Sequence, residues 1–366
     1  MYSLTPGYRV PAIQRGLSPA EVVISKTNAG AGAAILASAM LQTPPIWAFG
    51  AVAGIAGLIN VAPGRRSIAR WATVGVRHWW RDRRTTPGLA TSEGTTRTWT
   101  LYPHHGTMQD PYQRASFHEG FARALTFAAG QARTAGIQVH VAHHATVGDY
   151  TDHEQTISVH IPRGLIGQPE RVLNTIEGEF AALGVLALVT PQPVPAVTDR
   201  SSTWVELEEG RYAATARITG WPVEADGDLM PKLLLGQDAD RAGERTADRS
   251  LAVLYRPLPA AQSRRSAKWS EAAGAAFTTD KIKQDTNTVS SDTTRDALVQ
   301  GASLVDVDAY LTVWGDSPEE VTDARWNASL TADRHRISLD WLIGQQQRAH
   351  VMTTPHGAPT RKGAIL

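Results

Sequence analysis

The longest apolar run of this chain lies near its start. Residues 27–64 contain no Asp, Glu, Lys, Arg or His, although 19% of the whole chain is charged. Pro44-Pro45 interrupts the run where a helix must end, so we expect helices at about Asn28–Gln42 and about Ile46–Ala62. Glycines and alanines on both would let the backbones pack closely. The run predicts a two-helix transmembrane hairpin, with a buried helical hairpin in a soluble core as the alternative.

A basic segment, residues 65–84, follows the hairpin. It holds seven arginines against one aspartate, and its apolar residues recur at helical spacing. This pattern predicts a juxtamembrane amphipathic helix with aromatic rings and guanidinium groups at headgroup depth; a helix packed on the protein body is the alternative. The residues expected at the membrane interface are Arg65, Arg66, Arg70, Trp71, Trp79, Trp80, Arg81, Arg83 and Arg84.

Charge and composition suggest an orientation for this hairpin. The leading residues 1–26 contain several prolines and a net positive charge, so we expect an extended cytoplasmic arm. Positive charge on both sides of the hairpin predicts a two-pass inner-membrane protein with both termini cytoplasmic, beside anionic lipids. The chain has no Cys, which fits a reducing compartment, and no signal peptide is apparent.

From residue 95 the pattern changes to alternating strands and amphipathic helices. We expect one α+β unit over residues 95–192, a second over 200–350, and a loose tail over 351–366. The order of elements predicts a cytosolic α+β body rather than a doubly wound parallel sheet, and no internal repeat is evident. The expected strands are 96–102, 137–147, 155–161, 184–189, 204–207, 211–219, 250–255, 303–314 and 336–341, and the expected helices are 116–134, 169–182, 229–235, 260–276 and 318–332.

Several common catalytic and nucleotide-binding motifs are missing from the sequence. There is no phosphate-cradling G-x-x-x-x-G-K-[ST] loop, no G-x-S-x-G elbow and no cysteine nucleophile. We therefore expect no cofactor, no metal and no catalytic residue. One enrichment leaves an alternative open, a membrane-tethered hydrolase that uses the histidines His140, His143, His144, His153 and His160. In a strand His140 and His144 share a face and His143 points the other way, whereas a zinc site needs three or four convergent ligands.

Several segments resemble a known family. The hairpin with Gly64–Arg84, then Arg211–Pro222, Arg249–Arg265 and Val305–His350, are similar to actinobacterial proteins of the conjugation-type (type IV) secretion ATPase family. In that family a PrgI-like membrane hairpin and a pre-ATPase domain precede the ATPase domain. The resemblance implies the anchored scaffold without ATPase activity, because this sequence has no Walker residues. The runner-up resemblance is the EccE component of type VII secretion.

The expected function follows from this resemblance. It implies a non-catalytic, membrane-anchored scaffold subunit of a secretion or conjugation machine, which docks a separate ATPase and other subunits within an oligomeric assembly. No nucleic-acid site is evident. The expected docking element is Val305–His350, where Trp314, Trp326 and Trp341 serve either the core or an interface.

Overall fold

The computed structural model describes most of the body of the chain and parts of its beginning. The described residues are 24, 27–32, 35, 46–60, 68, 72, 93–105, 107, 110–147, 151–189, 195–222, 229–235, 247–267, 298–299 and 303–354. The chain divides into two compact units, which consist mainly of residues 88–342 with 346–365 and of residues 7–87. All the described strands belong to the first of these, the larger unit.

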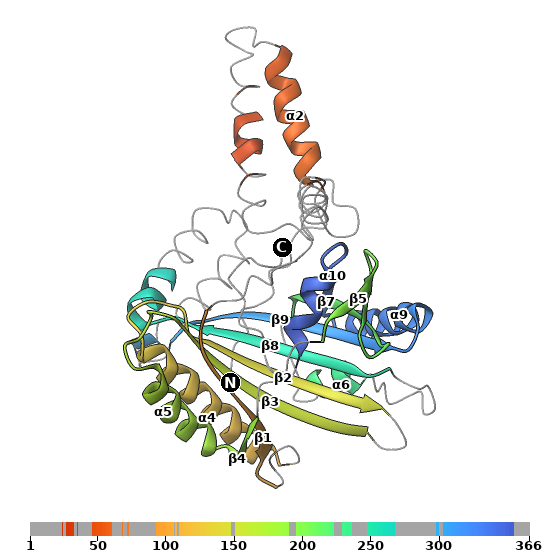
Figure 1. Cartoon of the computed structure of the whole chain (residues 1–366). Helices are drawn as coiled ribbons and strands as arrows, with labels where there is room; N and C mark the ends of the chain where they lie inside the picture. The colour runs from red at the N-terminus through yellow and green to blue at the C-terminus, as the bar shows by residue number, and fades with distance from the viewer. Residues whose placement is uncertain are drawn as a thin grey trace. The chain divides into compact units, whose positions relative to one another are not determined.

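Helix α2, Ile46–Asn60, is the longest described element of the smaller unit (Figure 1). It begins directly after Pro44-Pro45, as the sequence predicted. Residues 27–32 are also helical, and the side-chain Nδ2 of Asn28 donates a hydrogen bond of 2.9 Å to the carbonyl of Val52. The two helical stretches of the smaller unit therefore contact each other.

The predicted transmembrane hairpin is wrong. Within the described residues, none of the helices combines the length and the apolar character that a bilayer crossing requires. Helix α2 has 15 residues. At about 1.5 Å per residue such a helix spans roughly 22 Å, whereas the hydrocarbon core is about 30 Å thick. The uncharged run is long enough in total, but the proline pair divides it. The two-pass inner-membrane topology is wrong for the same reason.

Other predictions for the first 92 residues fall on positions without a described structure. Of the basic segment 65–84, only Ile68 and Ala72 are described, and both are helical. The nine predicted interface residues therefore lie outside the described residues, namely Arg65, Arg66, Arg70, Trp71, Trp79, Trp80, Arg81, Arg83 and Arg84. So do the arm 1–26, apart from Ile24, and the tail beyond Thr354.

The first half of the larger unit runs in the order β1-α4-β2-β3-α5-β4. Its bounds are β1 Gly94–Pro103, α4 Pro111–Gly130, β2 Gln138–Val147, β3 Thr151–Pro162, α5 Pro169–Ala181 and β4 Gly184–Val189. In the sheet these strands take the order β4-β1-β3-β2, and every pairing is antiparallel. This is the split βαβ, or ferredoxin-like, arrangement. Helix α4 begins at Pro111 because the Asp110 side chain accepts the amide of Tyr112, at 2.9 Å.

The second half repeats this topology. Its elements are β5 Val197–Arg200, β6 Val205–Leu207, β7 Tyr212–Gly220, α6 Leu229–Leu235, β8 Arg249–Pro257, β9 Val305–Gly315, α9 Pro318–Arg334, β10 Ser338–Trp341, α10 Gln346–Ala349 and the 3-10 helix η3 His350–Thr353. The run β7-α6-β8-β9-α9-β10 matches the first half, and its strands take the order β10-β7-β9-β8. The structure thus contains an internal repeat of topology that the sequence did not reveal.

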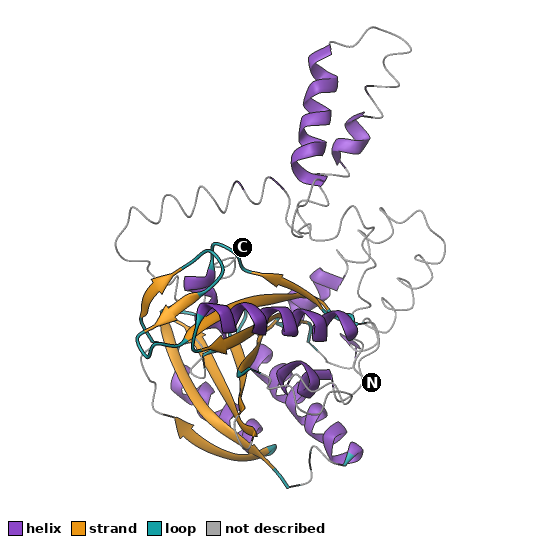
Figure 2. Ribbon diagram, turned by 90° about the vertical axis from the view of Figure 1, so that its right-hand side faces the viewer, coloured by secondary structure: helices purple, strands orange, loops and turns teal. Residues whose placement is uncertain are grey.

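Strands β2 and β8 join the two halves into one ten-stranded sheet. They pair antiparallel from Val139 opposite Tyr255 to Ala145 opposite Arg249, and Figure 1 shows β9, β8, β2 and β3 side by side. Val141, opposite Val253, packs in the apolar cluster under α4 and α5, while Val253 packs in the cluster under α6 and α9. Because opposed residues share a face of a sheet, all four helices cover the same face, here called the helical face (Figure 2).

The opposite face of the sheet is polar and yet largely buried; we call it the polar face. Its buried polar side chains include Thr98, Thr100, His140, Thr156, Ser158, His160, Thr215, Ser250 and Thr312. Helix α10 and η3 cover part of it, where Ala349 and Met352 pack against Leu254 and Tyr310. Hydrogen bonds between neighbouring strands satisfy many of these hydroxyls, for example Thr98 with Ser158 at 2.8 Å and Thr215 with Thr312 at 2.8 Å.

The body is an α+β fold built on an antiparallel sheet. Strand β4 and helix α6 have the bounds that the sequence predicted. Strand β3 begins at Thr151 instead of residue 155, because Asp152–Glu154 continue the pairing with β2. The sequence missed β5, α10 and η3, which are only four residues long each. The helix expected over 260–276 is described as far as Ala267.

Candidate functional site

The histidines of β2 and β3 are divided between the two faces of the sheet. His143 lies on the helical face and stacks on His153, with ring centroids 5.3 Å apart and His143 Nδ1 3.1 Å from His153 Nε2. Desolvation, reinforced by the neighbouring His153, lowers the pKa of His143 to about 3. The two imidazole rings therefore lie close together, but they are only two, whereas a zinc site needs three or four ligands.

His140, His144 and His160 lie on the polar face, as the alternation along β2 predicted for the first two. Each ring is held by a different partner. His140 Nε2 donates to the carbonyl of Met352 at 2.7 Å, His144 Nδ1 lies 2.7 Å from Ser250 Oγ, and His160 Nδ1 lies 2.8 Å from Thr96 Oγ1. Burial lowers the pKa of all three, that of His160 to about 4.

These positions bear on the hydrolase alternative. In the part of the chain that the structure describes, no group of three or more His, Cys, Asp or Glu side chains is arranged to hold a metal ion. The five histidines act as hydrogen-bonding or stacking members of the sheet. The arrangement does not provide the convergent ligands that the hydrolase interpretation required.

A charged cluster occupies the polar face over β7, β8 and β9. Asp308 accepts hydrogen bonds from Arg217 and from Arg256, the latter at 2.6 Å, and Arg256 also lies 3.9 Å from Asp306. Burial by itself raises the pKa of Asp308, but the two guanidinium groups outweigh it and hold the pKa below its usual value. Burial, with Asp308 nearby, raises the pKa of Tyr310 to about 12. Asp340 of β10, opposite Arg217, adds a third carboxylate, so the cluster links β7, β8, β9 and β10 on this face.

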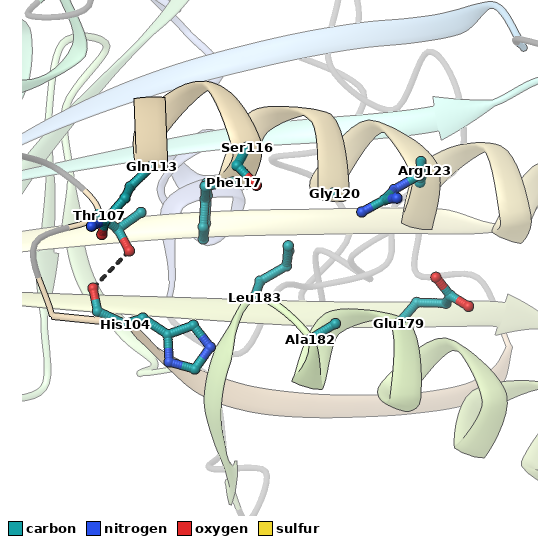
Figure 3. Close-up of a pocket in the computed structure, with 10 residues that line it drawn as sticks. All are labelled: His104, Thr107, Gln113, Ser116, Phe117, Gly120, Arg123, Glu179, Ala182 and Leu183. Carbon is teal, nitrogen blue, oxygen red and sulfur yellow. Dashed lines mark hydrogen bonds between the residues drawn. The ribbon is translucent and has the colours of Figure 1, made fainter. Parts of the chain in front are cut away.

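The first half contains a small cavity of about 210 Å³ (Figure 3). Phe117 from α4 and Leu183 from the α5–β4 turn form its apolar wall, while His104, Arg123 and Glu179 contribute polar groups. Ligand sites for small molecules usually enclose roughly 300–1,000 Å³. The cavity is below this size, so we do not assign it a ligand.

The three tryptophans of the predicted docking element differ in exposure. Trp314 donates to Ser250 Oγ at 2.8 Å and lies under the guanidinium of Arg211, 5.4 Å from the ring centroid. Trp341 donates to Ser329 Oγ at 3.0 Å. Trp326, by contrast, is 67% exposed on the outer side of α9. Two of the three therefore serve the protein's own packing, and Trp326 faces solvent.

Trp326 has an apolar neighbour on the same side of α9. Leu330 follows it by one helical turn and is 40% exposed. The buried residues of this helix, such as Val321, Ala324 and Ala328, point to the sheet. An exposed Trp–Leu pair gives nothing to the core, whereas exposed aromatic residues often anchor protein–protein contacts.

The comparisons with known proteins add no assignment. No protein-family model matches the chain, and no curated protein matches it.

The sequence singled out Trp326 together with Trp314 and Trp341, but nothing in their spacing separated the exposed residue from the two packed ones. The candidate site is the exposed Trp326–Leu330 side of α9, here called the α9 patch.

Proposed function

We propose that this protein is a scaffold subunit of a bacterial secretion or conjugation machine, and that the α9 patch docks a separate ATPase subunit. The observation that carries the proposal is the exposure of Trp326 and Leu330 one turn apart on a helix whose opposite side is fully packed. Tryptophan is among the residues that contribute most binding energy when an interface covers them.

The positions of the family-like segments support this proposal. Arg211–Pro222, Arg249–Arg265 and Val305–His350 are far apart in the sequence, but they supply β7, β8, β9, α9 and β10. Strand β9 pairs with both β7 and β8, and β10 pairs with β7. The segments that resemble secretion ATPase proteins therefore supply every element of one βαββαβ half except α6, Leu229–Leu235. A membrane anchor is not part of the proposal.

The surroundings of the α9 patch define the partner's chemistry. The exposed Asp323 and Asn327 flank the tryptophan and would form a polar rim around it. The matching surface on the ATPase is an apolar pocket that accepts an indole ring, bordered by hydrogen-bond donors. A residue of this kind, fully covered in a complex, contributes about 2 kcal/mol or more.

Point substitutions test the docking more sharply than truncation does. Deletion of Val305–Leu366 removes β9, which lies between β7 and β8 in the sheet, and so disrupts the fold itself. The test is a titration of the purified full chain with purified secretion and conjugation ATPase subunits by calorimetry. We expect one of them to bind, and Trp326→Ala to weaken binding about 30-fold, the equivalent of about 2 kcal/mol.

Tyr112→Ala is the matched control, because Tyr112 is an exposed aromatic residue on α4 in the other half of the sheet. It should bind the ATPase as tightly as the natural chain. Urea unfolding of both variants should match the natural chain within about 0.5 kcal/mol, because both side chains are exposed. Absence of binding to any of the ATPases, or equal binding by Trp326→Ala, overturns the proposal.

A further inference from the structure

The two ends of the sheet are built differently. Strand β5, at one end, has four residues, of which Asp199 and Arg200 are charged and exposed. Strand β4, at the other end, has the uncharged sequence GVLALV, and its Val185 and Leu188 are 65% and 70% exposed. Proteins usually protect sheet edges with short strands and charges, because an edge presents unpaired backbone groups to other strands. Strand β5 has this protection and β4 lacks it.

We propose that β4 pairs antiparallel with β4 of a second copy of this chain, about a two-fold axis at Ala187. In the described sheet β4 pairs with β1 alone, so alternate N–H and C=O groups along Gly184–Val189 point away from the sheet. A second strand can accept and donate to these groups. The surface is independent of the α9 patch, which lies in the other half of the larger unit.

The position of the two-fold axis follows from which side chains of β4 lie on the same face of the sheet. Leu186 lies opposite Leu101 and Leu188 opposite Trp99, two residues of the core under α4 and α5, so both leucines belong to the helical face. Val185 and Val189 belong to the polar face. With the axis at Ala187, Leu186 of one copy lies opposite Leu188 of the other, and Val185 opposite Val189. Each pair is apolar and shares a face, and the two alanines leave room at the centre.

A second copy suits this edge better than a different partner because the segment is self-complementary. Since it contains no charge, none of its residues meets a like charge across the two-fold axis. The same kind of junction already exists inside the chain. There β2 of one βαββαβ half pairs antiparallel with β8 of the other, over Val139–Ala145, with α4, α5, α6 and α9 on one face. Pairing through β4 extends this arrangement from one chain to two.

Cysteine cross-linking of the full chain tests both the contact and its register. The natural chain has no Cys, so each introduced thiol is unique. Across the proposed axis the two Cα atoms of residue 187 lie about 4.5–5.5 Å apart, within the range that a disulfide needs. Two copies of residue 185 lie about 14 Å apart, since each is opposite residue 189 and four residues span that distance. We expect Ala187→Cys to form a disulfide-linked dimer on mild oxidation at least tenfold faster than Val185→Cys.

Sedimentation equilibrium gives the second readout. The natural chain should associate to a dimer, and Ala187→Lys should raise the dimer dissociation constant at least tenfold, because two lysines then face each other at the axis. Thr198→Lys, which introduces a lysine at an exposed position of the protected edge strand β5, should leave the dissociation constant unchanged. A natural chain that stays monomeric at about 100 μM, equal cross-linking of the two cysteine variants, or a dimer unaffected by Ala187→Lys overturns the proposal.

Discussion

An Asp308→Asn substitution removes the carboxylate that two arginines share on the polar face of the sheet. Arg217 from β7 and Arg256 from β8 both donate to Asp308 of β9, which lies between these strands. The Asp308 side chain is 13% exposed, that of Arg256 is 12% exposed and that of Arg217 is 32% exposed. After the substitution the two guanidinium groups lose their shared carboxylate, while Asp306, 3.9 Å from Arg256, and Asp340, opposite Arg217 on β10, still offset part of their charges.

The cost of this change can be worked out from burial. Removal of one partner from a buried ion pair costs about 3–5 kcal/mol, because the other charge stays buried and uncompensated. Arg217 is partly exposed to solvent, and Asp306 and Asp340 still offset part of the two positive charges, so the expected cost falls to about 2–3 kcal/mol at pH 7. Asp306→Asn is the matched control on the same strand. Asp306 is 37% exposed and lies 3.9 Å from Arg256, so its loss should cost less than about 1 kcal/mol.

The assay is urea unfolding of the full chain at several pH values, followed by circular dichroism. The folded-state pKa of Asp308 lies below its usual value, so the ionised carboxylate stabilises the fold fully above about pH 4 and less as the pH falls through the lowered pKa. The difference in the free energy of unfolding between the natural chain and Asp308→Asn should therefore be constant between about pH 7 and 5 and become smaller below about pH 4. A difference below about 1 kcal/mol at pH 7, or one that grows in acid, refutes the reasoning.

Two further predictions concern packing and titration. Gly120→Ala should lower the free energy of unfolding by about 1–3 kcal/mol, because the new Cβ would lie 2.5 Å from Cδ2 of Leu183. Gly178→Ala, also within a helix but with no atom within 4 Å of the new Cβ, should raise the free energy of unfolding by about 0.5–1 kcal/mol. Thermal unfolding in which both variants are stabilised, or both destabilised, contradicts this. His143 and His160 should stay neutral at pH 5 in ¹⁵N NMR spectra, since burial lowers the pKa to about 3 and to about 4; a titration near pH 6.5 is the contrary result. The folded pKa lies below the unfolded value near 6.5, so their contribution to stability is complete above about pH 6.5 and decreases as the pH falls.

The sequence by itself determined most of the local structure of the body. Alternation of apolar and polar residues located β7, β8 and β9, because strand side chains alternate between faces. The hairpin before β7 was predictable at Gly210, whose φ of 73° favours glycine. Alternation also placed His140 and His144 on one face. All these features depend on neighbours within a few residues.

The sequence led to a wrong prediction where the long uncharged run over residues 27–64 suggested a transmembrane hairpin. Absence of charge over residues 27–64 is a property of composition, whereas crossing a bilayer depends on the length of each helix. Helix α2 ends after 15 residues. Beyond it, the interface residues predicted over 65–84 lie outside the described part of the chain, so the structure does not test them.

Only the tertiary structure decided which faces of the sheet are covered. The polar alternation along β2 is typical of a strand with one face in water, yet His140 is buried, because Met352, more than 200 residues later, covers it. In the same way, nothing in the sequence separated Trp314, Trp326 and Trp341, and only the packing of neighbouring elements left Trp314 and Trp341 half-buried and Trp326 exposed. The joint of β2 with β8 and the unprotected edge at β4 depend on pairings between distant segments. Local propensity does not encode such pairings, since they depend on how the whole chain shares its backbone hydrogen bonds.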